Sequence, residues 1–138
     1  MTRILTLAEV RTAGLAAYQA KQLSAQGPTP ACAYRDASGR PCIIGAAMTE
    51  SEVGAIGSSV PVNVFHLRTY TGVPNTVPEE RTELSTLQTV HDCWAKSHTD
   101  RRGASQLSQN IYPAPDRAVP DDAGPDFYEA WLVELLTQ

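Results

Sequence analysis

The chain has 138 residues, a formal net charge of −4, 42% hydrophobic residues and three cysteines. This length fits a single domain, residues 1–138, that can bury its own core without a disulfide or a metal to hold it together. The acidic balance disfavours nonspecific nucleic-acid binding, which needs a basic face, and no apolar run approaches the length that crosses a bilayer. We therefore expect a cytoplasmic protein with neither a nucleic-acid nor a membrane partner.

The first predicted element is a helix over residues 6–26. Thr6 and Glu9 have the spacing of a capping box. Small and apolar residues then recur at helical intervals: Leu7, Val10, Gly14, Ala17 and Tyr18. Because glycine and alanine lie in this stripe, we expect another element to approach the backbone of the helix closely.

A short β-hairpin is predicted over residues 31–44. Pairing Cys32 with Cys42 leaves a loop around Gly39, which can take a positive φ. Pro41 confines the second strand to an edge or an outward position, because proline cannot donate to a ladder. The apolar segment that follows fits either the end of this strand or the first turn of a buried helix.

The elements expected after the hairpin are mainly helical. Thr49 and Glu52 repeat the capping-box spacing and indicate a new helical turn. A helix over 79–97 begins with acidic residues, which the helix dipole favours there. A proline-rich loop over 99–125 and a helix over 125–137 with a wide apolar stripe complete the chain. The sequence predicts a small, mostly helical α+β domain with one short hairpin.

Cysteine and histidine residues raise the question of a metal site. Cys32, Cys42, His91 and Cys93 could supply four zinc ligands. However, His91 and Cys93 lie about 200° apart around the predicted helix and cannot converge on one ion. A disulfide between Cys32 and Cys42 is geometrically possible, but a cytosolic redox potential would keep both as thiols in the core. We expect no metal and no cofactor.

The catalytic alternative is a cysteine-dependent hydrolase or transferase. Cys42 would be the nucleophile, His91 its base and Asp92 the carboxylate that orients the imidazole. A helix that begins directly after Cys42 would favour the thiolate. Against this, His91 falls on the apolar stripe of helix 79–97, where a histidine is more often a core group. The sequence therefore favours a non-enzymatic protein over an enzyme.

Acidic residues gather near the C-terminus. The candidate binding residues are Asp116, Asp121, Asp122, Asp126 and Glu129. They form either an ordinary solvated surface with carboxylates near a helix N-terminus, or an acidic patch that meets a basic protein partner. A nucleic-acid site is a weaker alternative, because its basic residues lie in separate segments: Arg35, Arg40, Arg101 and Arg102.

The middle of the chain carries a pattern of C-x-Y, a turn glycine, C-x-x-G and, about forty residues later, L-Q-x-x-H-D. The matching residues are Cys32, Tyr34, Gly39, Cys42, Gly45, Leu87, Gln88, His91 and Asp92. This pattern resembles small uncharacterised proteins of phages and bacteria. The resemblance implies a phage or prophage setting, and an association of the hairpin with the helix that carries His91. We expect a phage-type accessory protein that binds another protein and inhibits a host defence or processing factor.

Overall fold

The computed structural model describes residues 3–23, 40–56, 67, 70–97 and 124–138. Its α-helices are α1 (Leu7–Gln19), α2 (Glu50–Ile56), α3 (Arg81–Ser97) and α5 (Pro125–Thr137). The strands are β1 (Ile4–Leu5) and β2 (Asn75–Thr76), and the 3₁₀ helices η1 (Gly45–Ala47) and η3 (Pro78–Glu80) precede α2 and α3. The predicted fold class, a small and mostly helical α+β domain, is confirmed.

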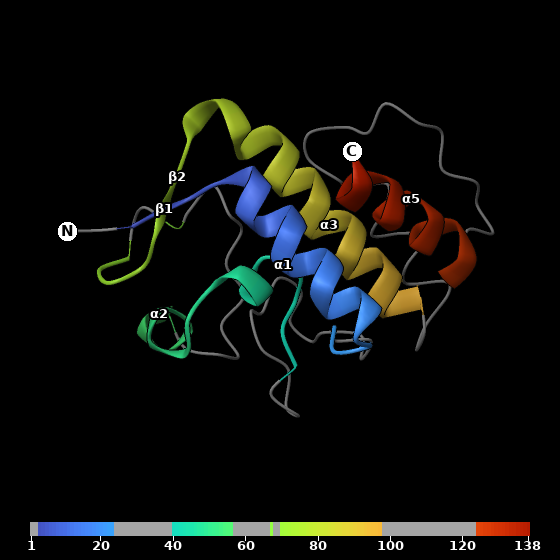
Figure 1. Cartoon of the computed structure of the whole chain (residues 1–138), viewed down its shortest axis with the longest axis horizontal. Helices are drawn as coiled ribbons and strands as arrows, with labels where there is room; N and C mark the ends of the chain where they lie inside the picture. The colour runs from blue at the N-terminus through green and yellow to red at the C-terminus, as the bar shows by residue number, and fades with distance from the viewer. Residues whose placement is uncertain (1–2, 24–39, 57–66, 68–69, 98–123) are drawn as a thin grey trace.

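The two strands form a parallel pair, which places the starts of α1 and α3 at the same end of the molecule. Ile4 lies opposite Asn75 and Leu5 opposite Thr76. Each strand leads directly into a helical segment, so α1 and α3 start at the same end of the molecule and run side by side (Figure 1). The carboxylate of Glu80 accepts a hydrogen bond of 2.9 Å from the Leu7 N–H. This bond satisfies one of the N-terminal amides of α1 that have no partner within the helix.

Helix α5 closes the core by packing against both α1 and α3, and it runs back in the opposite direction (Figure 1). Its apolar stripe contributes four buried side chains to the core: Tyr128, Trp131, Leu132 and Leu136. Leu84, Leu87 and Val90 of α3 are buried in the same core cluster. Burial of this shared apolar surface is the main force that holds the three helices together.

The helix predicted over residues 6–26 begins as expected but is shorter. It spans Leu7 to Gln19. Thr6 is the N-cap residue, and its hydroxyl oxygen accepts a hydrogen bond of 3.2 Å from the Glu9 N–H. The capping prediction is therefore confirmed, whereas the predicted C-terminal boundary is wrong.

The early end of α1 comes from the backbone of Lys21, whose φ of 57° lies in the left-handed region. The N–H groups of Lys21 and Gln22 donate to the carbonyl oxygens of Tyr18 and Ala17, at 3.0 and 2.8 Å. These two hydrogen bonds form a Schellman cap, which usually contains glycine at the left-handed position. A lysine in that position does not mark a helix end in the sequence.

The other helices agree with their predictions. At the start of α2, the Thr49 N–H donates to Glu52 Oε1 at 2.9 Å, and the Glu52 N–H donates to Thr49 Oγ1 at 3.2 Å. This is the reciprocal capping box that the spacing predicted. Together η3 and α3 cover 78–97, against the prediction of 79–97, and α5 matches the predicted 125–137.

Much of the predicted hairpin over 31–44 and of the loop over 99–125 lies outside the described residues. Of the second hairpin strand, Pro41 forms an isolated bridge, and residues 43–44 make a turn that leads into η1. The strand alternative for this apolar segment is therefore wrong. The helical alternative is met by a single 3₁₀ turn, which ends where the backbone of Met48 becomes extended. Ile43 and Ile44 are both fully buried, which is consistent with a buried turn leading into a helix.

Gly14 lets the segment around Ile43 approach α1 closely, as its place in the stripe predicted. A Cβ on Gly14 would lie 2.5 Å from Ile43 Cδ1 and 3.1 Å from Leu136 Cδ2. Because both side chains are buried, Gly14→Val is expected to lower the free energy of unfolding by about 2 kcal/mol through overpacking. Urea denaturation measures this change.

Gly54 provides the matched control, because a Cβ there would meet nothing within 4 Å. Gly54→Ala lies inside α2 and is expected to stabilise the protein by about 0.5–1 kcal/mol through helix propensity. If Gly14→Val left the midpoint of the urea transition unchanged, the close contact between α1 and Ile43 would be contradicted.

Candidate functional site

Cys42, the candidate nucleophile, lies in the core on the turn before η1. It is 2% exposed, and the side chains of Ile43 and Ile44 beside it are completely buried. The Gly45 N–H donates a hydrogen bond of 3.2 Å to Cys42 Sγ. A backbone donor directed at the sulfur is the arrangement expected of a nucleophile at a helix start, but this burial keeps the sulfur from contact with solvent.

His91, the candidate base, is 1% exposed and lies on α3 with its ring centroid 5.7 Å from that of Trp94. Neither ring nitrogen has a hydrogen-bond partner among the described residues. Asp92 Oδ1 is 3.8 Å from His91 Nδ1, which is longer than a hydrogen bond. The inward direction predicted for His91 is confirmed.

Cys93 is the second described cysteine and is also buried. Both Cys42 and Cys93 are thiols. Burial, together with the nearby Asp92 carboxylate, raises the pKa of the Cys93 thiol to about 12, so this sulfur is protonated near neutral pH. The described residues contain no group of three or more histidine, cysteine or acidic side chains that could hold a metal ion.

The remaining residues of the C-x-Y…C-x-x-G and L-Q-x-x-H-D pattern divide into two groups. Gly45, Leu87 and Gln88 are all buried, so the described part of the pattern belongs to the core. Cys32, Tyr34 and Gly39 lie outside the described residues. The association of the hairpin with α3 therefore stays a prediction.

The acidic candidates are also divided. Asp126 is exposed in the first turn of α5, while Asp116, Asp121 and Asp122 lie outside the described residues. Glu129 is half-buried and accepts a hydrogen bond of 2.6 Å from the Tyr18 hydroxyl. Glu129 therefore links α5 to α1, a structural contact that the sequence did not indicate.

The Tyr18–Glu129 hydrogen bond forms part of the wall of a pocket of about 420 Å³. Its lining comes from the end of α1, from α3, from α5 and from the chain near residue 40: Tyr18, Gln19, Lys21, Leu23, Arg40, Trp94 and Glu129. The rings of Tyr18 and Trp94 meet edge to face, with their centroids 6.4 Å apart. Aromatic walls with a few charged groups are typical of small-molecule sites.

The same hydrogen bond shifts the pKa of Tyr18. Donation to the Glu129 carboxylate, reinforced by desolvation, raises the pKa of Tyr18 to about 12. The phenol therefore stays protonated and continues to donate throughout the neutral pH range. The Tyr18 hydroxyl accordingly holds the Glu129 carboxylate in place at the pocket wall.

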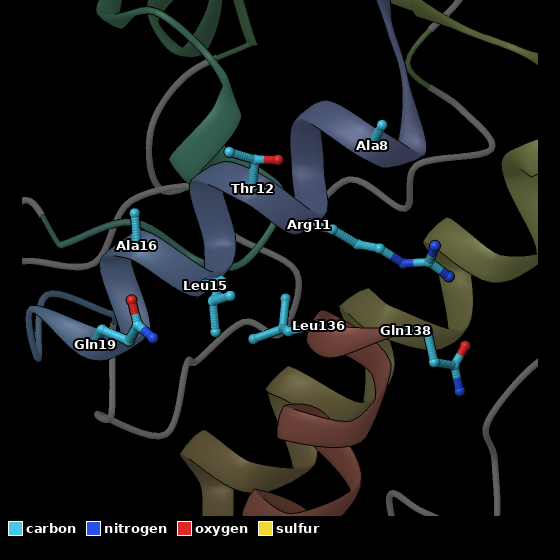
Figure 2. A pocket seen from close by; sticks show the side chains of 8 residues that line it. All are labelled: Ala8, Arg11, Thr12, Leu15, Ala16, Gln19, Leu136 and Gln138. Atoms are coloured by element: carbon cyan, nitrogen blue, oxygen red, sulfur yellow. The ribbon is translucent and has the colours of Figure 1, made fainter.

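A second, shallower depression of about 370 Å³ lies between α1 and the C-terminal end of α5 (Figure 2). The side chains of Leu15 and Leu136 point toward each other, and the small residues Ala8 and Ala16 of α1 are also part of the lining. Arg11 at its edge forms an ion pair of 3.3 Å with Glu83. The lining of this depression contains fewer aromatic and charged side chains than the lining of the Tyr18–Glu129 pocket.

The sequence does not indicate Tyr18, Lys21 and Trp94 as pocket residues. Tyr18 falls on the apolar stripe predicted for helix 6–26, and Trp94 lies three residues after His91 on helix 79–97, so each residue alone favours a core position. Only the packing of α1, α3 and α5 brings them together. No local sequence signal would have revealed this convergence.

Comparisons with known proteins identify no relative on which a function could rest. The chain matches no protein-family model, no curated protein and no solved structure. Among the helices of the described residues, none is both long enough and apolar enough to cross a membrane.

Proposed function

We propose that the protein is a non-enzymatic, cytoplasmic accessory protein that binds a protein partner through an acidic face of α5. The acidic face is defined here as Asp126, Ala130 and Glu134, which are all exposed and follow one another at intervals of four residues. Residues at this spacing lie on one side of a helix. The described segment 124–138 contains three acidic residues and no lysine or arginine, so this surface complements a basic partner.

The opposite side of α5 supports this role. Tyr128, Trp131 and Leu132 are buried against the rest of the core, which fixes the orientation of the helix. A surface on a well-packed helix loses little conformational entropy when it binds, and this favours affinity. The acidic face is therefore presented by a preorganised element.

The burial of the candidate catalytic pair favours binding over catalysis. A thiol enzyme needs its sulfur and its base within reach of a substrate. Cys42 and His91 are instead both buried in the core. We assign them to the architecture that holds η1 and α3 in place.

The setting that we propose follows from the sequence pattern of residues 32 to 92. Its resemblance to small phage and bacterial proteins favours a phage or prophage protein. In that setting the partner would be a host defence or processing factor, and binding would inhibit it. A small acidic domain suits this role, because electrostatic complementarity accelerates association with a basic target.

Neutralising the acidic face is expected to weaken partner binding by about tenfold, since each exposed ion pair contributes up to about 1 kcal/mol. The test variant combines Asp126→Asn with Glu134→Gln. The control variant, Glu50→Gln with Glu79→Gln, removes two exposed acidic groups elsewhere and so changes the net charge equally, from −4 to −2.

The measurement is quantitative crosslinking and mass spectrometry of proteins captured by wild type and by both variants at low and at high salt. The proposal predicts that partners captured by wild type and by the control variant are lost with the α5 variant, and that capture falls as salt rises. Equal capture by both variants, with no dependence on salt, would reject the acidic face as the binding surface.

A further inference from the structure

We propose that the pocket between α1, α3 and α5 binds a small aromatic monoanion, a function separate from the acidic face of α5. The pocket has a volume of about 420 Å³. This value falls in the range of about 300–1,000 Å³ that is typical of small-molecule sites. A fused two-ring body with one carboxylate is a ligand of suitable size.

The aromatic and aliphatic side chains of the lining indicate that the ligand has an aromatic part. Trp94 and Tyr18 line the pocket with their rings inclined by 65°, and Leu23 adds an aliphatic side chain. Since Trp94 is only 8% exposed, the pocket reaches toward the core. A planar ring placed there would bury apolar surface against the indole, with an aromatic contact that favours offset or edge-to-face geometry.

The negative charge of the ligand is indicated by two cationic side chains, Lys21 and Arg40, in the pocket lining. Within the described residues, no ion pair involves the Lys21 ammonium. Among the described residues of the lining, the remaining charged group is the carboxylate of Glu129. The Lys21 ammonium attracts an anion in a chain whose overall charge is −4, and repulsion from the Glu129 carboxylate favours a ligand with a single negative charge.

The backbone of Lys21 supports a role for its side chain. With φ at 57°, Lys21 occupies a position where glycine would fit without strain, and a non-glycine residue there costs roughly 1 kcal/mol. Residues kept in such conformations cluster at ligand sites. The Schellman cap itself needs only the backbone of this residue, so the lysine side chain is available for another purpose.

The test uses 1-naphthoate as the anionic probe and 1-naphthamide as its neutral analogue of nearly the same shape. Each is titrated into the full-length protein, and two-dimensional NMR follows the indole N–H signals of Trp94 and Trp131, which are the two tryptophans of the chain. We expect 1-naphthoate to shift the Trp94 signal saturably while the Trp131 signal stays in place. The amide should bind about fivefold more weakly, because it lacks the charge.

Two variants separate loss of binding from loss of folding. Lys21→Gly removes the ammonium and relieves the left-handed backbone, so the melting temperature should not fall while naphthoate binds about fivefold more weakly. Glu129→Gln removes the repulsive charge and keeps an oxygen that can accept from Tyr18, so naphthoate should bind about threefold more tightly. The proposal is overturned if the Trp94 signal does not move in the folded protein. It is also overturned if acid and amide bind equally, or if a folded Lys21→Gly variant retains the wild-type affinity.

Discussion

Replacing Leu132 with alanine is expected to lower the free energy of unfolding by about 3 kcal/mol, since fully buried leucines lose 2–5 kcal/mol on this change. Leu132 is 0% exposed and lies on the stripe by which α5 packs against the core. The loss combines the removed apolar contact with the cavity left behind. For a chain of this length, the melting temperature should fall by roughly 10 °C.

The control for this prediction is Glu134→Ala on the exposed side of the same helix. It is expected to change the stability by less than about 0.5 kcal/mol, as most surface substitutions do. Calorimetry of both variants measures the difference. A Leu132→Ala variant that melts with the wild type would mean that α5 is not an integral part of the core.

Helix α5 matters for both proposals because it carries a different functional group on each side. Asp126 and Glu134 are exposed, whereas Glu129 faces the pocket with Tyr18. A variant that loosens α5 should therefore impair partner binding and naphthoate binding together. The variant that combines Asp126→Asn with Glu134→Gln should impair only partner binding, and Lys21→Gly should impair only naphthoate binding, which separates the two proposals.

Local signals in the sequence were sufficient to predict where the helices begin. The capping residues Thr6 and Thr49 act within a few positions of themselves, and both caps form as predicted. The inward direction of His91 followed from its place on the apolar stripe of α3. These features depend on interactions between neighbours in the sequence.

Features that depend on distant contacts were not predicted. The β1–β2 pair joins residues about seventy positions apart through strands of two residues, too short to show alternation. One local feature also differs from its prediction: α1 ends earlier, because the left-handed residue of its cap is a lysine and leaves no glycine signal in the sequence. The pocket is formed by Tyr18, Trp94 and Glu129 from three helices, and only tertiary packing brings them together.

The difference between local signals and tertiary contacts also explains why the sequence left the catalytic alternative open. Cys42, His91 and Asp92 have the right chemistry for a thiol enzyme, and residue type alone kept that alternative open. Exposure to a substrate is a tertiary property. In the structure, all three are less than 5% exposed.

Cys42 is therefore expected to react with iodoacetamide at least about 100-fold more slowly in the folded protein than in the denatured protein. A buried thiol reacts only when the structure around it opens. The fraction of molecules that are open at any moment is set by the free energy of local unfolding. Cys93, which is buried and has a pKa raised to about 12, should be protected in the same way. His91→Ala should change the protection of Cys42 only as far as it changes the stability.

The most direct test of the account is the rate of Cys42 alkylation at neutral pH, resolved by peptide mass spectrometry, with Cys93 as the internal reference. If Cys42 and Cys93 are both protected in the folded protein and both labelled quickly after denaturation, the thiol belongs to the core and an enzyme with Cys42 as nucleophile is excluded. Rapid, stoichiometric labelling of Cys42 alone in the folded protein, abolished in a folded His91→Ala variant, would contradict the account and identify a cysteine-dependent enzyme.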